Sequence, residues 1–253
     1  MKTITFIGNG NMALSIAQGL KECYKIEVVG RSISKLEKFG QNLGVDIEKS
    51  LIDGFNIQDK TIILCVKPYN IEEVSAKLSG KAKVIYSVLA GSTIQKIKNN
   101  FNTTAVIRTM PNLAASVHHS MTTLTGSEEF KNDALEIFNS IGSTVWLGSE
   151  KELDIATALA GSGPAYLALI AEALADGAVK QGLKRDDAMA IMRGLFGGFG
   201  KLINEIHPAL LKDGVMSPGG TTAAGYTALE KGNVRNACID AIEAAYKRAT
   251  ELS

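Results

Sequence analysis

Short runs of β-branched and other apolar residues alternate with amphipathic segments along the first part of the chain. This alternation is typical of an α/β fold, in which crossover helices cover both faces of a parallel sheet. It predicts strands at residues 3–7, 26–29, 61–66, 84–88, 104–107, 121–124 and 144–147. It predicts helices between them at residues 11–22, 34–42, 71–78, 93–99 and 128–140.

The pattern changes after Gly148, where the β-branched runs stop and Ala-rich helical sequence punctuated by glycine begins. We therefore expect two domains, residues 1–150 and residues 151–253, of which the second is all-α. Further helices are predicted at residues 187–205, with Asp186 as the N-cap, and at residues 222–231 and 234–252.

One segment of the second domain is apolar on every side: between Ala165 and Ala175 only Glu172 is polar. A helix of this kind has to be buried on every side. A helical domain of about a hundred residues can hardly surround it alone, because small domains bury a limited share of their surface. We therefore expect a second copy of the chain to cover part of this helix.

Composition excludes several classes of protein. The 253 residues carry 27 Lys and Arg against 26 Asp and Glu, so no basic excess favours a nucleic acid or a membrane surface. The three cysteines and three histidines lack the spacing of a metal site or a disulfide framework. No signal-peptide pattern opens the chain, and polar residues interrupt the apolar stretch at 153–175. We expect a cytoplasmic protein without a metal.

The turn between the first strand and the first helix carries the first chemical signal, GNGNMA at residues 8–13. Gly8 permits a tight turn, Gly10 lets the backbone approach a pyrophosphate, and Ala13 lets the helix pack closely on the sheet. Asn11 and Met12 begin the helix, whose free N–H groups attract an anion. The sequence therefore predicts a Rossmann-type dinucleotide-binding domain over residues 1–150; a glycine-rich turn without a ligand is the alternative.

The second predicted strand ends without the acidic residue that would bind the ribose 2′-hydroxyl of NAD. Arg31 and Ser32 stand there instead, and a guanidinium matches the oxygens of the 2′-phosphate of NADP. NADPH is therefore the preferred cofactor, with NADH as the alternative; a solvated loop arginine is the structural alternative.

The third long strand ends in CVKP at residues 65–68. Open α/β sheets bind ligands at the carboxyl ends of their strands, so Cys65, Val66, Lys67 and Pro68 are predicted to border the cofactor. Cys65 lies in an apolar strand and is expected to be a small buried side chain, not a nucleophile.

Six motifs follow one another along the chain: GNGNMA at 8–13, CVKP at 65–68, SVLAG at 87–91, RTMPN at 108–112, LAGSGPAY at 159–166 and SPGGTTAAG at 217–225. Together they resemble the pyrroline-5-carboxylate reductases, and the resemblance covers essentially the whole chain. The last two motifs in combination are highly specific to this family. The chain departs from it in having Leu113 and Ala114 after Asn112, where the family commonly has Thr-Pro, and Gly30 before Arg31, where Asn is frequent.

The resemblance implies reduction of 1-pyrroline-5-carboxylate to L-proline by hydride from NADPH, in the last step of proline biosynthesis. It implies further cofactor contacts at Ala90, Met110, Pro111 and Asn112. It also implies a homodimer as the minimal unit, with residues 151–253 serving dimerisation and substrate binding. Family members are often decameric rings of dimers, and the sequence leaves this further assembly open.

A substrate with a carboxylate and a C=N bond needs an anion cradle and a donor near nitrogen. In SPGGTT, Ser217, Gly219 and Gly220 precede an Ala-rich helix, whose backbone N–H groups and positive dipole end suit a carboxylate. By resemblance Thr222 lies near the imine nitrogen, where its hydroxyl orients and relays a proton. Thr221 belongs to the same loop, and a simple helix cap is its alternative.

Two more residues complete the predicted substrate site. Val215 lies near the loop and is expected to line the ring pocket. Glu205 matches an acidic position of the family close to the substrate, although a surface carboxylate at a helix end is the alternative. Two other functions compete with this reading: a hydroxyacid dehydrogenase of similar architecture, and a non-catalytic NADP-binding redox sensor.

Overall fold

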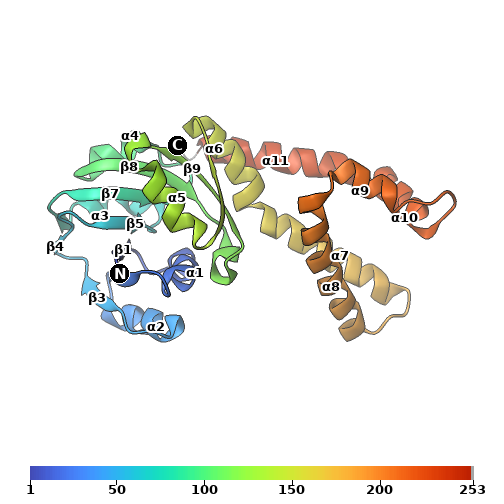
Figure 1. Cartoon of the computed structure of the whole chain (residues 1–253), viewed down its shortest axis with the longest axis horizontal. Helices are drawn as coiled ribbons and strands as arrows, with labels where there is room; N and C mark the ends of the chain where they lie inside the picture. Colours follow the sequence, from blue (N-terminus) through green and yellow to red (C-terminus); the bar gives the residue numbers. More distant parts are fainter. Residues whose placement is uncertain (252–253) are drawn as a thin grey trace. The chain divides into compact units, whose positions relative to one another are not determined.

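The computed structural model describes residues 1–251. They form two compact units, one made of residues 1–162 with the chain from Ala244 onward, and one made of residues 163–243. Figure 1 shows the sheet of the first unit in blue to green and the helices of the second in yellow to red.

The first unit is built on an eight-stranded sheet with the order β10-β9-β8-β7-β5-β1-β2-β3. Its strands are β1 (Thr3–Ile7), β2 (Lys25–Gly30), β3 (Glu48–Leu51), β5 (Thr61–Leu64), β7 (Ala82–Ser87), β8 (Thr103–Met110), β9 (Ser120–Gly126) and β10 (Gly142–Trp146). Neighbours run parallel except β8 and β9, which are antiparallel. From β3 to β8 the order is that of a doubly wound Rossmann-type sheet, as predicted.

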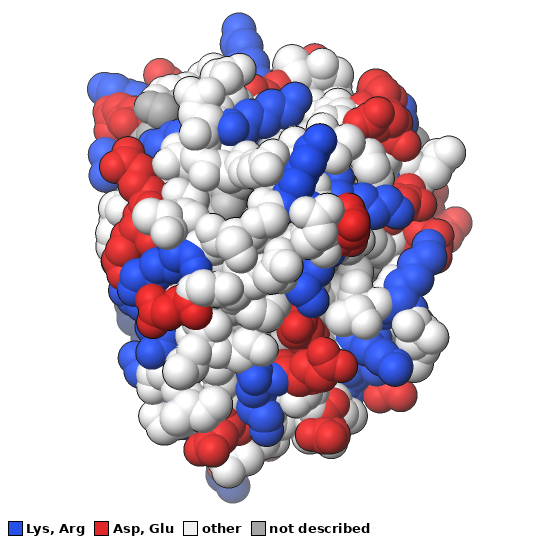
Figure 2. All heavy atoms as spheres, turned by 90° about the vertical axis from the view of Figure 1, so that its left-hand side faces the viewer, with Lys and Arg blue, Asp and Glu red and all other residues white. Residues whose placement is uncertain are grey.

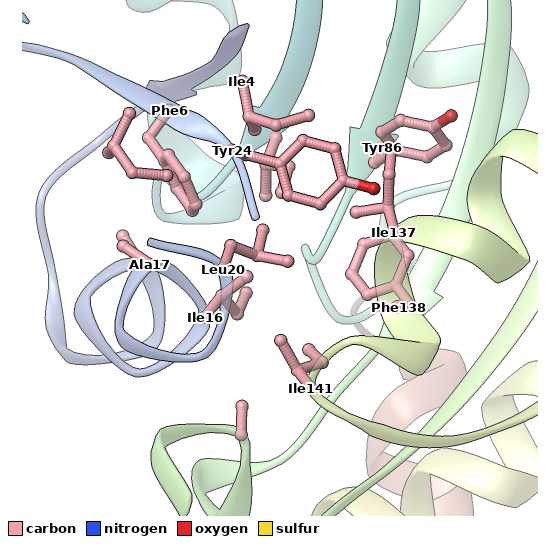
Figure 3. Packing of buried hydrophobic residues seen from close by; sticks show 14 of the residues in the cluster. Ile4, Phe6, Ile16, Ala17, Leu20, Tyr24, Tyr86, Ile137, Phe138 and Ile141 are labelled. Atoms are coloured by element: carbon pink, nitrogen blue, oxygen red, sulfur yellow. The ribbon is translucent and has the colours of Figure 1, made fainter. Parts of the chain in front are cut away.

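Helices cover both faces of the sheet because successive side chains of a strand point to opposite sides. The helices are α1 (Asn11–Leu20), α2 (Ile33–Leu43), α3 (Ile71–Ser75), α4 (Ile94–Asn100) and α5 (Lys131–Asn139). On β1, Ile4 and Phe6 join the core beneath α1, α2 and α5 (Figure 3), whereas Ile7 joins the core beneath α3 and α4. In the first core the rings of Tyr86 and Phe138 meet edge to face, with centroids 5.7 Å apart.

All seven predicted strands are present, and three further strands were missed. These are β3 at the sheet edge and the pair β4 (Phe55–Asn56) and β6 (Leu78–Ser79). β3 is largely exposed, so it has no apolar run to reveal it. The helix predicted at residues 71–78 ends at Ser75, and Leu78 pairs with Phe55 in β6 instead.

From β10 to residue 251 the chain forms helices joined by short turns and no further strand, as predicted. Its helices are α6 (Glu150–Ala156), the π-helical turn η4 (Thr157–Gly161), α7 (Gly163–Lys180), α8 (Arg185–Glu205), α9 (Pro208–Gly214), α10 (Thr221–Lys231) and α11 (Val234–Glu251). The prediction of Asp186 as an N-cap is wrong: Lys184 holds that position, and Asp186 lies in the first turn, where its charge complements the helix dipole. Residue 252 of the last predicted helix lies outside the described residues.

In the second unit, apolar side chains of α7 and α8 remain exposed within one chain. The most exposed apolar residues of these two helices include Leu167, Leu169, Ile191 and Leu195, and Leu169 is 67% exposed. Single apolar residues on a surface are ordinary, but two helices with several each mark a surface that binds another protein or a membrane. By length and composition alone, residues 150–180 could also cross a membrane.

On the face shown in Figure 2, Lys and Arg side chains are interspersed with Asp and Glu, and neither sign forms a continuous patch. Within residues 1–251 no group of three or more His, Cys, Asp or Glu side chains is arranged to hold a metal ion.

Candidate functional site

A cavity of about 170 Å³ lies where β1, β2 and β5 end, at the point where the strand order reverses. Ligands of open α/β sheets bind at this switch point. The cavity is lined by Gly8, Asn9, Gly10, Val29, Gly30, Arg31, Ile52, Cys65, Val66, Lys67, Asn70 and Val74. Six predicted cofactor residues thus come together here: Gly8, Gly10, Arg31, Cys65, Val66 and Lys67.

Two glycines shape the floor of the cavity for different reasons. Gly8 has φ of +105°, and a Cβ there would lie 2.6 Å from the Cys65 carbonyl oxygen, so only glycine lets β1 turn this close to β5. Gly10 is the N-cap of α1, and a Cβ there would meet no protein atom within 4 Å. Because no side chain caps α1, its first N–H groups remain available to an anion. This cradle fits the pyrophosphate of a dinucleotide.

Residues after β2 border the same cavity. Arg31 is exposed, and its Nη1 atom lies 3.6 Å from Oε2 of Glu73 on α3. Ser32 is the N-cap of α2, and its hydroxyl lies 3.0 Å from that of Ser34. Of these two residues, Arg31 lines the cavity and Ser32 does not.

The loop after β5 forms another wall of the cavity. Cys65 is partly buried and packs against the core, and this burial raises the pKa of its thiol, so the thiol stays protonated and behaves as a small apolar side chain. Pro68 opens a 3₁₀ turn, η1 (Pro68–Asn70), that leads into α3. Val66 and Lys67 line the cavity, and Pro68 does not.

The remaining predicted cofactor residues lie outside this cavity. Asn11 begins α1 beside a second cavity, Met12 packs against the core and Ala13 is fully buried. Ala90 is half-buried, and Met110 and Pro111 are buried near the end of β8.

Asn112 organises the turn that follows β8. Its Nδ2 donates to the Ala160 carbonyl at 3.0 Å, and its Oδ1 accepts from the Ala114 N–H at 3.0 Å. Its own N–H donates to the Ser120 hydroxyl at 3.1 Å. These contacts fix the turn although Leu113 and Ala114 replace the usual Thr-Pro.

Arg108 is a structural residue that sequence reasoning overlooked. It is fully buried on β8, where Nη1 lies 3.0 Å from Glu150 Oε1 and Nη2 lies 2.7 Å from Asp154 Oδ1. Glu150 also accepts from the Ile94 N–H at 2.8 Å. The sequence did contain one signal for this partner: Glu150 and Asp154 are four residues apart at the start of α6, so both carboxylates lie on one face of the helix.

In the second unit the SPGGTT loop forms a tight turn before α10. The Gly220 N–H donates to the Ser217 carbonyl at 3.0 Å, and Gly219 has φ of +71°, which favours glycine. Gly220 is the N-cap and Thr221 the first helical residue, so Thr221 is not the cap that the alternative reading required. No side chain caps α10, which leaves its first N–H groups open to an anion.

The other predicted substrate residues belong to the same unit. Thr222 is exposed in the first turn of α10, and among residues 1–251 its hydroxyl has no hydrogen-bond partner. Val215 follows α9 and is 58% exposed. Glu205 is the last residue of α8 and is exposed, and α9 separates it from the loop along the chain.

Comparisons with known proteins agree with this architecture. Residues 150–252 match the family model described as pyrroline-5-carboxylate reductase dimerisation, and residues 3–91 match that described as NADP oxidoreductase, coenzyme F420-dependent. A pyrroline-5-carboxylate reductase of Synechocystis is 42% identical over 201 residues, which cover 76% of this chain and 75% of that protein.

Two solved structures are similar over almost the whole chain. The 1-pyrroline-5-carboxylate reductase of Streptococcus pyogenes has a TM-score of 0.86 and 31% identity, and the match covers 98% of each chain. The pyrroline carboxylate reductase of Plasmodium falciparum, solved with NADP bound, has a TM-score of 0.81 and 25% identity, covering 99% of this chain and 98% of that one.

A Rossmann-type domain with a dinucleotide cradle, followed by an all-α dimerisation domain, defines an oxidoreductase that uses a nicotinamide cofactor. The agreement in sequence and structure over the full length goes further than this class. The chain belongs to the pyrroline-5-carboxylate reductase family.

Proposed function

We propose that this protein reduces 1-pyrroline-5-carboxylate to L-proline, the last step of proline biosynthesis. One observation carries the proposal: a single chain contains two uncapped helix N-termini, each preceded by a glycine turn, at α1 and at α10. The first suits the pyrophosphate of a dinucleotide, and the second suits the carboxylate of a small substrate. A hydroxyacid dehydrogenase is not favoured, since such an enzyme typically relies on a lysine of its helical domain as the acid, whereas this chain has the SPGGTT loop at its proposed substrate site.

NADPH is the cofactor that we propose, with NADH as the alternative donor. When bound, it supplies a hydride to the C=N bond of the substrate. The loops lining the cavity at Gly8–Gly10 and Cys65–Lys67 would hold it, and Arg31 would pair with its 2′-phosphate. Ser32, Pro68, Ala90 and residues 110–112 remain proposed contacts outside that cavity.

The substrate loop would do two things. The backbone N–H groups after Gly219 and Gly220 would bind the carboxylate, because an uncapped helix N-terminus carries partial positive charge. Thr222 would donate a hydrogen bond from its hydroxyl to the imine nitrogen, and so orient the substrate and relay a proton from solvent water to that nitrogen. A free threonine hydroxyl is too weak an acid to supply that proton alone. Val215 and Glu205 would border the same site.

We propose a homodimer as the minimal unit and a decamer as its larger assembly. The exposed apolar side chains of α7 and α8 support a partner surface, and the match to a dimerisation domain covers both helices. A second copy of this chain that covers these side chains would account for the apolar residues between 150 and 180, so no membrane is needed to explain them. The balanced charge and the widely spaced cysteines favour the cytoplasm as its location.

The decisive experiment compares turnover by the wild type and by Thr222→Ala, measured as the fall in NADPH absorbance on adding pyrroline-5-carboxylate. Loss of one positioned donor should lower kcat/KM roughly ten- to a thousandfold. NADPH affinity should stay within about twofold, because the proposed cofactor contacts belong to the other unit.

Two further variants separate chemistry from packing. Thr222→Ser keeps the hydroxyl and should recover most of the activity. Thr227→Ala is the matched control. Thr227 lies on the same helix, where its hydroxyl donates to the Ala223 carbonyl, and its replacement should leave turnover unchanged. A Thr222→Ala enzyme with normal kcat and a raised KM alone would make Thr222 a binding contact only. NADPH binding without any wild-type turnover would support the redox-sensor alternative instead.

A further inference from the structure

Four charged side chains form a connected row beside the cofactor cavity. Glu73 on α3 lies between two cations: its Oε2 is 3.6 Å from Arg31 Nη1, and its Oε1 is 3.5 Å from Lys77 Nζ. Lys77 is also 3.3 Å from Asp53. The next residue of α3, Val74, lines the cavity together with Arg31. Glu73 therefore lies beside the side chain of Arg31 at the rim of the cavity.

This contact gives Arg31 a partner before any cofactor arrives. A 2′-phosphate that binds the guanidinium must share it with the Glu73 carboxylate or displace that carboxylate, since both carry negative charge. Displacement leaves Glu73 paired, because Lys77 remains 3.5 Å away. The 2′-hydroxyl of NADH is neutral and does not compete for the cation.

We propose that Glu73 lowers the preference for NADPH over NADH by competing with the 2′-phosphate for Arg31. This inference rests on the proposed function, in which Arg31 binds that phosphate. Glu73 lowers the affinity for NADPH and leaves the affinity for NADH almost unchanged. It is a specificity-determining residue that acts through Arg31.

The expected size of the effect follows from exposure. The side chains of Arg31 and Glu73 are 59% and 48% exposed, so water screens their attraction. Exposed pairs of this kind change an equilibrium by roughly two- to fivefold. Salt should diminish the effect further, because the Debye length falls to about 3 Å at 1 M ionic strength.

The test measures NADPH and NADH dissociation constants for the full-length protein by fluorescence titration at low salt. Glu73→Gln should tighten NADPH binding roughly two- to fivefold and leave NADH within about 1.5-fold. Glu72→Gln is the matched control: it removes the same charge from the adjacent, exposed position, and within residues 1–251 Glu72 has no ion-pair partner. It should change neither constant.

A double variant tests whether Glu73 acts through Arg31. Arg31→Ala should weaken NADPH roughly ten- to a hundredfold and spare NADH. Adding Glu73→Gln to Arg31→Ala should then have no effect on NADPH. A tightening that persists in this background would show direct repulsion of the phosphate and overturn the competition.

The remaining outcomes distinguish this inference from the proposed function. Equal NADPH constants for Glu73→Gln and Glu72→Gln, with a normal loss in Arg31→Ala, would overturn the inference and leave the 2′-phosphate site standing. Equal tightening of NADPH and NADH by Glu73→Gln would also overturn it. If Arg31→Ala binds NADPH as well as the wild type does, the proposed phosphate site itself fails.

Discussion

Replacing Gly10 by alanine should weaken cofactor binding and cost the fold little stability. Gly10 and Gly8 stand two residues apart in one turn, but their surroundings differ. A Cβ on Gly10 would enter open space, whereas a Cβ on Gly8 would lie 2.6 Å from the Cys65 carbonyl oxygen. The same substitution at the two positions therefore tests two different roles of glycine.

The expected magnitudes follow from these surroundings. Gly10 has φ of −82°, which alanine adopts freely, and its change at an N-cap costs about 1 kcal/mol or less of unfolding free energy. A methyl group placed between the backbone and a bound pyrophosphate costs roughly 1–3 kcal/mol, or about five- to a hundredfold in NADPH affinity. Gly8→Ala combines φ of +105° with the collision and should cost about 3 kcal/mol or more of unfolding free energy.

The assay pairs urea unfolding, followed by circular dichroism, with NADPH titration of each variant. Gly10→Ala should unfold at nearly the wild-type midpoint and bind NADPH poorly, and Gly8→Ala should unfold at a clearly lower midpoint. Wild-type NADPH affinity in Gly10→Ala would refute the placement of the pyrophosphate against this turn. An unchanged unfolding midpoint in Gly8→Ala would contradict the close approach of β1 and β5.

Two further predictions concern other parts of the chain. Leu169→Glu places a charge on an exposed apolar helix and should dissociate the dimer in sedimentation velocity, whereas a wild-type monomer at micromolar concentration would contradict the proposed assembly. Iodoacetamide at pH 8 should alkylate exposed Cys23 much faster than Cys65. The reason is that burial raises the pKa of the Cys65 thiol, so little of it is present as the reactive thiolate. Comparable alkylation rates of the two cysteines, measured by mass spectrometry, would refute this.

The sequence by itself determined the elements whose pattern is local. The strand at residues 3–7, the turn at 8–13 and the start of α10 follow from apolar runs and glycine placement, which depend on near neighbours in the chain. The edge strand β3 and the small β4–β6 pair were missed, since little of their sequence is apolar and they exist because a neighbouring strand pairs with them. The end of α3 at Ser75 is likewise set by the strand that follows.

Tertiary structure alone decided which distant side chains meet. Arg108 pairs with Glu150 and Asp154, and Arg31 lies beside Glu73; each partner is more than 40 residues away in the sequence. The sequence shows that a charged side chain needs either water or a partner of opposite charge. It does not show which partner, because that depends on the strand order of the sheet and on where each helix ends. Arg31 was predicted to face the cofactor, and only the fold placed the competing carboxylate beside it.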